Sequence, residues 1–328
     1  MRAFDYTSPT RVDEVIELLA RDGSGSTRPL AGGTDLLTLM KADIVSPEQL
    51  VNIKGLPELI GISFDPDTGL QIGGLTTLAE LEYNDLVRQH YPALAEALAV
   101  AATPQLRNMA TLAGNLLQRP RCWYFRNHRF HCWLKGGDDC PMREGENRFA
   151  AVLEQSPCWA VHPSDIAPVL LAYDADLQIR GPQGERRLTV AGFLQPPTEE
   201  RRSETMLAPD ELLLFVRVPA PAPGTRSTYR KAMDRKIWAF ALAAVAAVIR
   251  FDGDQVAEAR LILSGLANVP WRAREAEAEL IGSSLSEATI ARAAAAALAS
   301  AQPLRQNRYK IPLTRALMRQ ALQQLAGP

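Results

Sequence analysis

The sequence lacks two features that would point to a membrane or to nucleic acid. It has no apolar segment long enough to cross a bilayer, because the longest apolar run, 238–249, is about half the required length and is followed directly by Arg250. This run predicts a buried strand or helix instead. The formal net charge is only -1, so no excess of positive charge favours a nucleic acid as a general partner.

The N-terminal segment also lacks a basic stretch leading into an apolar run, so we expect no signal peptide and a cytoplasmic protein. Export of a folded complex on the twin-arginine signal of a partner would place the chain in the periplasm instead.

The length of the chain and its proline usage predict the domain organisation. A chain of 328 residues exceeds the size at which a single core usually stops growing. The proline-rich segment 219–224 is the clearest linker. We therefore expect a first domain at 1–222, with subdomains 1–57 and 58–222, and an α+β C-terminal domain at 223–328.

The spacing of apolar residues predicts the individual elements. In the first domain we expect a strand at 4–6, a helix at 12–20, a strand ending at 51–53, a strand at 70–74 and helices at 78–86 and 94–101. A further strand at 177–180 leads into a hairpin loop at 181–184. In the C-terminal domain we expect strands at 228–232 and 256–265 and helices at 271–281, 286–301 and 313–325.

Two segments that contain glycine are candidate ligand-binding sites. The first, LAGGTDL at 30–36, places two glycines where a strand turns into a helix. Free backbone N–H groups and a hydroxyl at that point suit a pyrophosphate. The segment is not the GxGxxG of a dinucleotide fold, and adjacent glycines are by themselves more often a tight turn.

The second segment runs from 102 to 116, ATPQLRNMATLAGNL. Small residues at Ala110, Ala113 and Gly114 would let the backbone lie flat against a ligand, and Thr111 and Asn115 offer hydrogen bonds. A helix followed by a glycine turn is the alternative interpretation.

The two segments occur in order with three others: HPSDIAPVL at 162–170, ELL at 211–213 and YRK at 229–231. This ordered set, which spans nearly the whole chain, resembles the FAD subunit of the xanthine dehydrogenase and carbon monoxide dehydrogenase flavoprotein family. The resemblance implies an α+β fold: a two-subdomain FAD-binding domain of the PCMH type, followed by a C-terminal domain of the CO dehydrogenase flavoprotein type.

The resemblance also implies a set of FAD-binding residues. The pyrophosphate would be held by the two glycine segments, the ribityl or ribose region by Asp165, and the flavin would lie near Lys231, with Arg230 as the competing choice. Leu212 or Leu213 would lie against the isoalloxazine ring. No residue is expected to act as acid or base on the organic substrate. The full set is Leu30, Ala31, Gly32, Gly33, Thr34, Asp35, Leu36, Ala102, Thr103, Asn108, Thr111, Gly114, Asn115, Asp165, Leu212 and Lys231.

All four cysteines of the chain, Cys122, Cys132, Cys140 and Cys158, fall within one short stretch. The absence of an export signal disfavours disulfides. Structural zinc normally uses closely paired cysteines, which the wide gaps here do not provide, although His128 and His131 keep zinc open. A [4Fe–4S] cluster needs four thiolates, and an irregular loop can supply them. Nearby aromatic residues would exclude water and nearby basic residues would offset the thiolate charge: Trp123, Tyr124, Phe125, Phe130 and Trp133, and Arg121, Arg126, Arg129, Lys135 and Arg143.

Most of the family lacks this insertion at 119–160. A subset carries it, and this sequence resembles that subset: the middle subunit of 4-hydroxybenzoyl-CoA reductase and bacterial aldehyde oxidoreductases of the YagS type. In that subset the four cysteines ligate a [4Fe–4S] cluster, which would either extend the electron relay or brace the loop.

The resemblance implies an electron-transfer function. A molybdopterin-binding large subunit would oxidise an organic substrate, a small [2Fe–2S] subunit would pass single electrons, and FAD on this chain would deliver them to an external acceptor such as NAD, oxygen or a quinone. The alternatives are a free-standing flavin reductase of the same fold and, from another class, a zinc-braced binding module without enzymatic activity.

Overall fold

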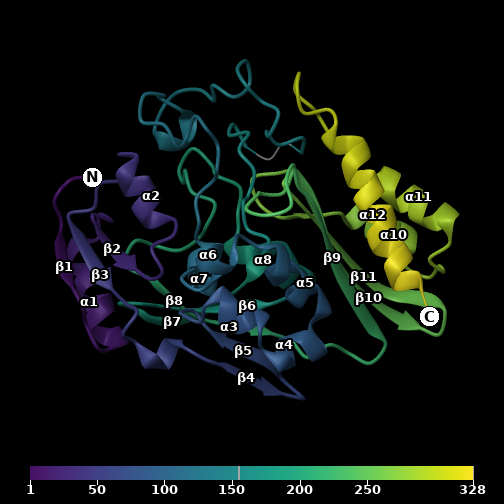
Figure 1. Ribbon diagram of the computed structural model, residues 1–328, viewed down its shortest axis with the longest axis horizontal. Helices are drawn as coiled ribbons and strands as arrows, with labels where there is room; N and C mark the ends of the chain where they lie inside the picture. Colours follow the sequence, from purple (N-terminus) through teal and green to yellow (C-terminus); the bar gives the residue numbers. More distant parts are fainter. Residues whose placement is uncertain (154–155, 328) are drawn as a thin grey trace.

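The N-terminal unit is a small α/β layer. The computed structural model describes residues 1–153 and 156–327 (Figure 1). Strands β1 (Asp5–Thr7), β3 (Gln49–Asn52) and β2 (Thr27–Leu30) form a parallel sheet in that order, with α1 (Val12–Asp22) and α2 (Leu36–Lys41) as connections. Helix α1 buries Val12, Val15, Ile16 and Leu19, which is the spacing of one helix face. The predicted α/β unit is confirmed.

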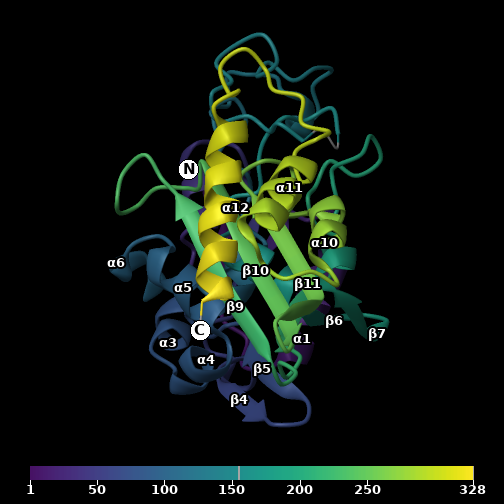
Figure 2. The ribbon, with the colours of Figure 1, turned by 90° about the vertical axis from the view of Figure 1, so that its right-hand side faces the viewer.

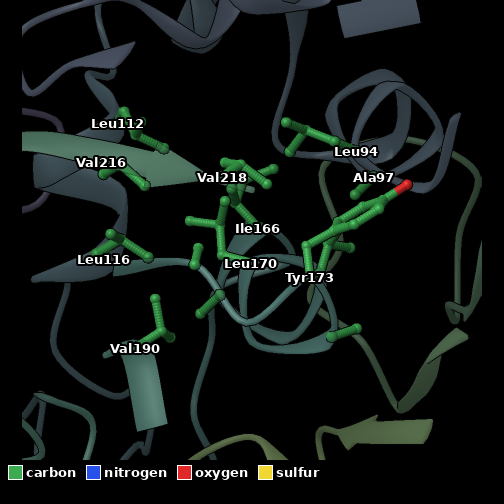
Figure 3. Close-up of a cluster of buried hydrophobic side chains, with 14 of the residues drawn as sticks. Leu94, Ala97, Leu112, Leu116, Ile166, Leu170, Tyr173, Val190, Val216 and Val218 are labelled. Atoms are coloured by element: carbon green, nitrogen blue, oxygen red, sulfur yellow. The ribbon is translucent and has the colours of Figure 1, made fainter. Parts of the chain in front are cut away.

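The middle unit is built on a five-stranded antiparallel sheet of order β4-β5-β8-β6-β7. Its strands are β4 (Ile62–Asp65), β5 (Gly69–Gly73), β6 (Asp176–Gly181), β7 (Gly184–Thr189) and β8 (Leu212–Val218). Its helices are η1 (Pro57–Leu59), α3 (Leu78–Glu82), α4 (Asp85–His90), α5 (Pro92–Val100), α6 (Pro104–Arg107), α7 (Leu112–Leu116), α8 (Ile166–Ala172) and α9 (Val190–Phe193). Helices α5, α7 and α8 bury Leu94, Leu116 and Ile166 against strand residues Val216 and Val218 (Figure 3).

The predicted helix at 78–86 is wrong as a continuous element. It divides at Tyr83 into α3 and α4 because the side chain of Asn84 accepts a hydrogen bond from the Val87 N–H and caps a new helix. The hairpin loop predicted at 181–184 is confirmed, since β6 and β7 pair directly across it.

The C-terminal unit is an antiparallel sheet of order β12-β11-β10-β9 covered by helices. Its elements are β9 (Thr225–Ala232), β10 (Ala243–Asp252), β11 (Gln255–Ser264), β12 (Trp271–Arg272), α10 (Arg274–Leu280), α11 (Glu287–Ala296) and α12 (Lys310–Ala326). Figure 2 shows α12 lying along this sheet. The helix predicted from 271 starts three residues later, because Trp271 and Arg272 pair with β11 as a short strand.

Strand β10 explains the long apolar run. Ala244, Ala246 and Val248 belong to the core of the middle unit, whereas Val245 and Ala247 belong to the core beneath the C-terminal helices. A strand that is buried on both faces has no polar alternation. The prediction fails for the start of the run, however, because Trp238 and Phe240 lie on an exposed loop before the strand.

The cysteine-rich insertion predicted at 119–160 has almost no regular structure. Residues 154–155 of that range lie outside the described residues; in the described remainder, the 3-10 helix η2 (Trp133–Lys135) is the only helix or strand. The insertion lies at the top of the view in Figure 1, above α6, α7 and α8. In the part of the chain that is described, no helix is long and apolar enough to cross a membrane.

Candidate functional site

The two glycine segments meet. A Cβ atom added to Gly32 would lie 1.7 Å from the carbonyl oxygen of Met109, so only glycine permits this close approach. Gly33 has a φ of +71°, in the left-handed region that glycine adopts without strain. The first segment therefore packs directly on the second, as a shared ligand site requires.

The second segment consists of two short capped helices. Ala102 has a φ of +50° and precedes Thr103, whose side chain accepts a hydrogen bond from the Leu106 N–H at 3.2 Å and caps α6. Asn108 ends that helix. Thr111 then caps α7 by accepting from the Gly114 N–H at 3.2 Å. The caps explain why threonine stands at both helix starts.

Asn115 links the second segment to the third. Its Oδ1 accepts a hydrogen bond from the Ser164 hydroxyl at 2.5 Å, and Ser164 Oγ in turn accepts from the backbone N–H groups of Ile166 and Ala167. Ser164 is 1% exposed. The sequence interpretation gave Ser164 no role of its own, although it stands beside the chosen Asp165 in the same motif.

Asp165 and Lys231 form a buried ion pair. Lys231 Nζ donates to Asp165 Oδ2 at 2.8 Å and to the Val100 carbonyl at 3.2 Å, and the Tyr229 hydroxyl donates to Asp165 Oδ1 at 2.7 Å. Burial raises the pKa of Asp165 above its ordinary value, and the Lys231 ammonium limits that rise. The pair joins β9 to the start of α8. Tyr229, which the sequence interpretation assigned no contact, completes it.

Asp35 turns toward the insertion. Its carboxylate accepts hydrogen bonds from Arg121 at 2.5 Å, from Arg126 at 2.7 Å and from the backbone N–H of Arg119 at 2.9 Å. The side chain predicted to contact FAD thus anchors the insertion to the first glycine segment. A role toward FAD stays a prediction.

The remaining predicted FAD residues lie in the first segment and in β8. Leu30 and Leu36 pack in a small core with Met40 and Leu50. Leu212 is buried in the core beneath α1, and Leu213 belongs to the core of the middle unit. The two leucines on β8 therefore face different cores.

The four cysteines converge within the insertion. All are free; Cys132, Cys140 and Cys158 are buried and Cys122 is half-buried. Cys122 packs with Cys132 and Cys158 in one apolar cluster and with Cys140 in a second. Burial raises the pKa of the Cys122 thiol to about 11, with smaller contributions from Cys140 and Cys132. The described residues include no group of three or more His, Cys, Asp or Glu arranged to hold one metal ion.

The aromatic and basic residues of the insertion do not all act as expected. Phe125 and Trp133 are buried, but Trp123 is 55% exposed and Phe130 is 42% exposed, so these two do not exclude water. Among the basic residues, Lys135 donates to the carbonyls of Tyr124 and Asn127. The side chains of Arg121 and Arg126 bind Asp35, and Arg126 also binds loop carbonyls. These hydrogen bonds, like those of Lys135, satisfy loop backbone groups that a sheet would otherwise pair. An offset of the thiolate charge stays a prediction.

Two segments of the C-terminal unit hold the end of the insertion. Asn268 Nδ2 donates to the carbonyls of Cys158 and Ala160 at 2.8 and 2.7 Å. Before α12, Asn307 Nδ2 donates to the carbonyls of Ala150 and Ala151 at 3.1 and 2.9 Å. These contacts join residues more than 100 positions apart, which no local sequence pattern could have indicated.

Known proteins resemble the chain over nearly its whole length. Residues 2–221 match the family described as FAD binding domain in molybdopterin dehydrogenase, and residues 227–325 match the CO dehydrogenase flavoprotein C-terminal domain. The aldehyde oxidoreductase FAD-binding subunit PaoB of Escherichia coli K12 is 39% identical over 320 residues, 96% of each chain. The carbon monoxide dehydrogenase medium chain of Hydrogenophaga pseudoflava is 29% identical over 97% of this chain and 96% of its own.

Solved structures agree with this assignment. A carbon monoxide dehydrogenase from Hydrogenophaga pseudoflava, lacking the Mo-pyranopterin moiety of its cofactor, has a TM-score of 0.78 at 28% identity and covers 98% of this chain and 96% of its own. The predicted fold, an α+β FAD-binding domain followed by a flavoprotein C-terminal domain, is confirmed. The chain belongs to the family of FAD-binding subunits of molybdenum hydroxylases, and is thus a subunit of an FAD-dependent oxidoreductase.

Proposed function

We propose that this chain takes electrons from iron–sulfur centres of its complex and passes them through FAD to an external acceptor. The complex would contain a molybdopterin-binding large subunit, where an aldehyde or related substrate is oxidised, and a small [2Fe–2S] subunit. The similarity to an aldehyde oxidoreductase subunit and to medium chains of carbon monoxide dehydrogenases supports this composition. Bound FAD would exchange electrons singly with iron–sulfur centres and in pairs with other acceptors.

The contact of Gly32 with Met109 is the observation that carries the FAD assignment on this chain. It brings the glycine turn of the first segment directly against the backbone of the second, which supports a shared site for a large, phosphate-bearing ligand. In this proposal Leu30 to Leu36, together with Thr111, Gly114 and Asn115, hold the pyrophosphate, with Ala102, Thr103 and Asn108 beside them. Asp165 and Lys231 lie toward the ribityl chain and the flavin. Leu212 completes the proposed set.

We also propose that Cys122, Cys132, Cys140 and Cys158 ligate a [4Fe–4S] cluster. Their convergence in an irregular loop supports this, as do backbone N–H groups directed at the sulfurs, such as Ala160 N–H at 3.4 Å from Cys158 Sγ. Such hydrogen bonds are typical of iron–sulfur sites. One zinc ion would need its ligands about 4 Å apart, and no such group occurs in the described residues. A cluster binds each sulfur to a different iron.

The experiment is iron, acid-labile sulfide and flavin analysis of the native complex and of a Cys140→Ser variant. We expect the variant to lose four iron, four sulfide and the corresponding part of the broad brown absorption, while most flavin and the iron of the small [2Fe–2S] subunit are retained. Met142→Leu, which changes a buried neighbour without a thiol, is the matched control. Unchanged iron in Cys140→Ser refutes the ligand assignment, and a colourless zinc protein refutes both cofactors.

A further inference from the structure

A buried ion pair joins the second glycine segment to a helix outside it, and neither partner belongs to the proposed FAD set. Arg107 on α6 donates from Nε and Nη2 to the two carboxylate oxygens of Glu82, at 2.7 and 2.9 Å. Glu82 is the last residue of α3, which lies next to α6 (Figure 1). The two side chains are only 7% and 14% exposed, so water competes little for this contact. A two-point contact of this kind fixes the plane of the guanidinium.

The third nitrogen of the Arg107 guanidinium binds the backbone at the start of the segment. Nη1 donates to the Ala101 carbonyl at 2.8 Å. Helix α5 ends at Val100, and the last carbonyls of a helix have no partner within it. The Val100 carbonyl accepts a hydrogen bond from Lys231 Nζ at 3.2 Å. Two buried cations from different elements therefore hold two consecutive carbonyls.

The residue that follows these carbonyls has a backbone conformation that alanine rarely adopts. Ala102 has a φ of +50°, in the left-handed region where a Cβ atom lies too close to a carbonyl oxygen. Without a contact that holds it there, an alanine favours a negative φ. The hydrogen bond from Arg107 is such a contact, because the carbonyl of Ala101 belongs to the peptide plane that rotates with the φ of Ala102. Thr103 then caps α6, the helix that carries Arg107.

Helix α3 also holds the later part of the segment. At its start, the Leu78 N–H donates to the Ala110 carbonyl, and the Leu112 N–H donates to the Thr76 carbonyl, both at 2.9 Å. At its end, Glu82 binds the arginine of α6. One short helix therefore fixes both parts of the second glycine segment from the outside.

We propose that Arg107, oriented by Glu82, is a positioning residue for FAD: it keeps Ala102 in the left-handed conformation in which the second glycine segment accepts the cofactor. The inference rests on the proposed placement of FAD against residues 30–36 and 102–116. Arg107 needs no contact with FAD. It keeps the site formed before FAD binds, so that cofactor binding does not have to supply the energy of the strained conformation.

The test measures the dissociation constant of FAD by ultrafiltration of the native complex equilibrated with added FAD, with fluorimetry of the free flavin. Arg107→Lys keeps the charge but loses the planar fork that binds Glu82 and the Ala101 carbonyl together. We expect it to weaken FAD binding about tenfold, the factor that corresponds to the cost of a left-handed conformation for a residue with a side chain. Glu82→Gln, which keeps the shape and one acceptor oxygen, should weaken binding about threefold.

A second-site variant separates positioning from general stability. Glycine adopts a positive φ without strain, so Arg107→Lys combined with Ala102→Gly should bind FAD within about threefold of wild type, although its Tm should not recover. The control is Arg272→Lys. Arg272 also contacts both carboxylate oxygens of a buried glutamate, Glu277, but it lies on β12, at the opposite edge of the C-terminal sheet from β9. This control should lower the Tm without changing the affinity for FAD.

Three results overturn the proposal. The first is an unchanged affinity in both Arg107→Lys and Glu82→Gln. The second is a loss that Ala102→Gly does not reverse, and the third is an equal loss in Arg272→Lys, because both would assign the effect to stability and not to the conformation of Ala102. If Arg107→Lys yields no complex, Glu82→Gln with and without Ala102→Gly decides. Failure of the proposed function is a different result, namely a wild-type complex that binds no FAD.

Discussion

The proposed FAD cradle, defined as residues 30–36 and 102–116, and the insertion at 119–160 lie side by side but are built in opposite ways. In the cradle, conformation follows from local chemistry: Gly33 takes a positive φ, and Thr103 and Thr111 cap the helices that follow them. In the insertion, the loop backbone is bound by side chains from far along the chain. Arg202, for example, donates to the carbonyls of Trp133 and Gly137, both at 2.7 Å. The conformation of the cradle can therefore be predicted from the sequence, whereas that of the insertion cannot.

The largest effect is expected from Gly32→Ala in the cradle. The new methyl group would meet the Met109 carbonyl oxygen, a backbone atom that cannot rotate away. We expect a loss of about 3 kcal/mol in the free energy of unfolding, as overpacked sites show, together with loss of bound flavin. Denaturant unfolding and flavin analysis measure the two results.

Gly55→Ala is the control, because a Cβ atom there has no heavy atom within 4 Å and should change neither quantity. Normal flavin content in Gly32→Ala would contradict the view that the contact of the two segments forms the cofactor site.

A smaller effect is expected from Asp35→Asn, which tests the connection between the two regions. The variant keeps the shape but removes the charge that binds Arg121 and Arg126, whose side chains are 28% and 17% exposed. We expect a loss of about 2 kcal/mol, because these charge-assisted bonds are largely shielded from water. The insertion should become the first site of cleavage in limited proteolysis.

Asp13→Asn is the matched control, since Asp13 pairs with Arg180 at a more exposed site of the same N-terminal unit and should change stability little. Cleavage that starts elsewhere in Asp35→Asn would show that Asp35 does not hold the insertion.

The smallest effect concerns Lys310, which donates to the carbonyls of Phe149 and Gly265 at 3.1 and 2.6 Å. Burial lowers the pKa of Lys310 to about 7, whereas the unfolded chain keeps a pKa near 10.4. The unfolded state therefore binds more protons between these values, and stability should rise with pH, by about 1 kcal/mol from pH 7 to pH 8.

Thermal unfolding of the wild type and of Lys310→Met at both pH values measures this difference. The methionine variant has no proton to gain, so the increment from this site should disappear. A wild-type stability that falls over this interval, or a variant with the same increment, would show that Lys310 is not the group responsible.

Much of the fold could be predicted because its signals are local. The spacing of apolar residues in α1 and the glycines between β6 and β7 act over a few residues, so both elements are confirmed. The predictions failed where the tertiary structure, and not the local sequence, determines the conformation. Trp271 was predicted to start a helix, yet it pairs with Leu263 of β11. Trp238 belongs to the apolar run that was predicted to be buried, yet it lies on an exposed loop.

The sequence by itself determined the family, the order of the two glycine segments and the position of the four cysteines, because each depends on which residues occur and in what order. Only the tertiary structure decided that Asp35 binds Arg126 of the insertion, that Asp165 pairs with Lys231, and that Arg202 binds two carbonyls of the insertion. These depend on distances between residues far apart in the chain, and such distances exist only once the backbone has folded and water has been excluded from between them.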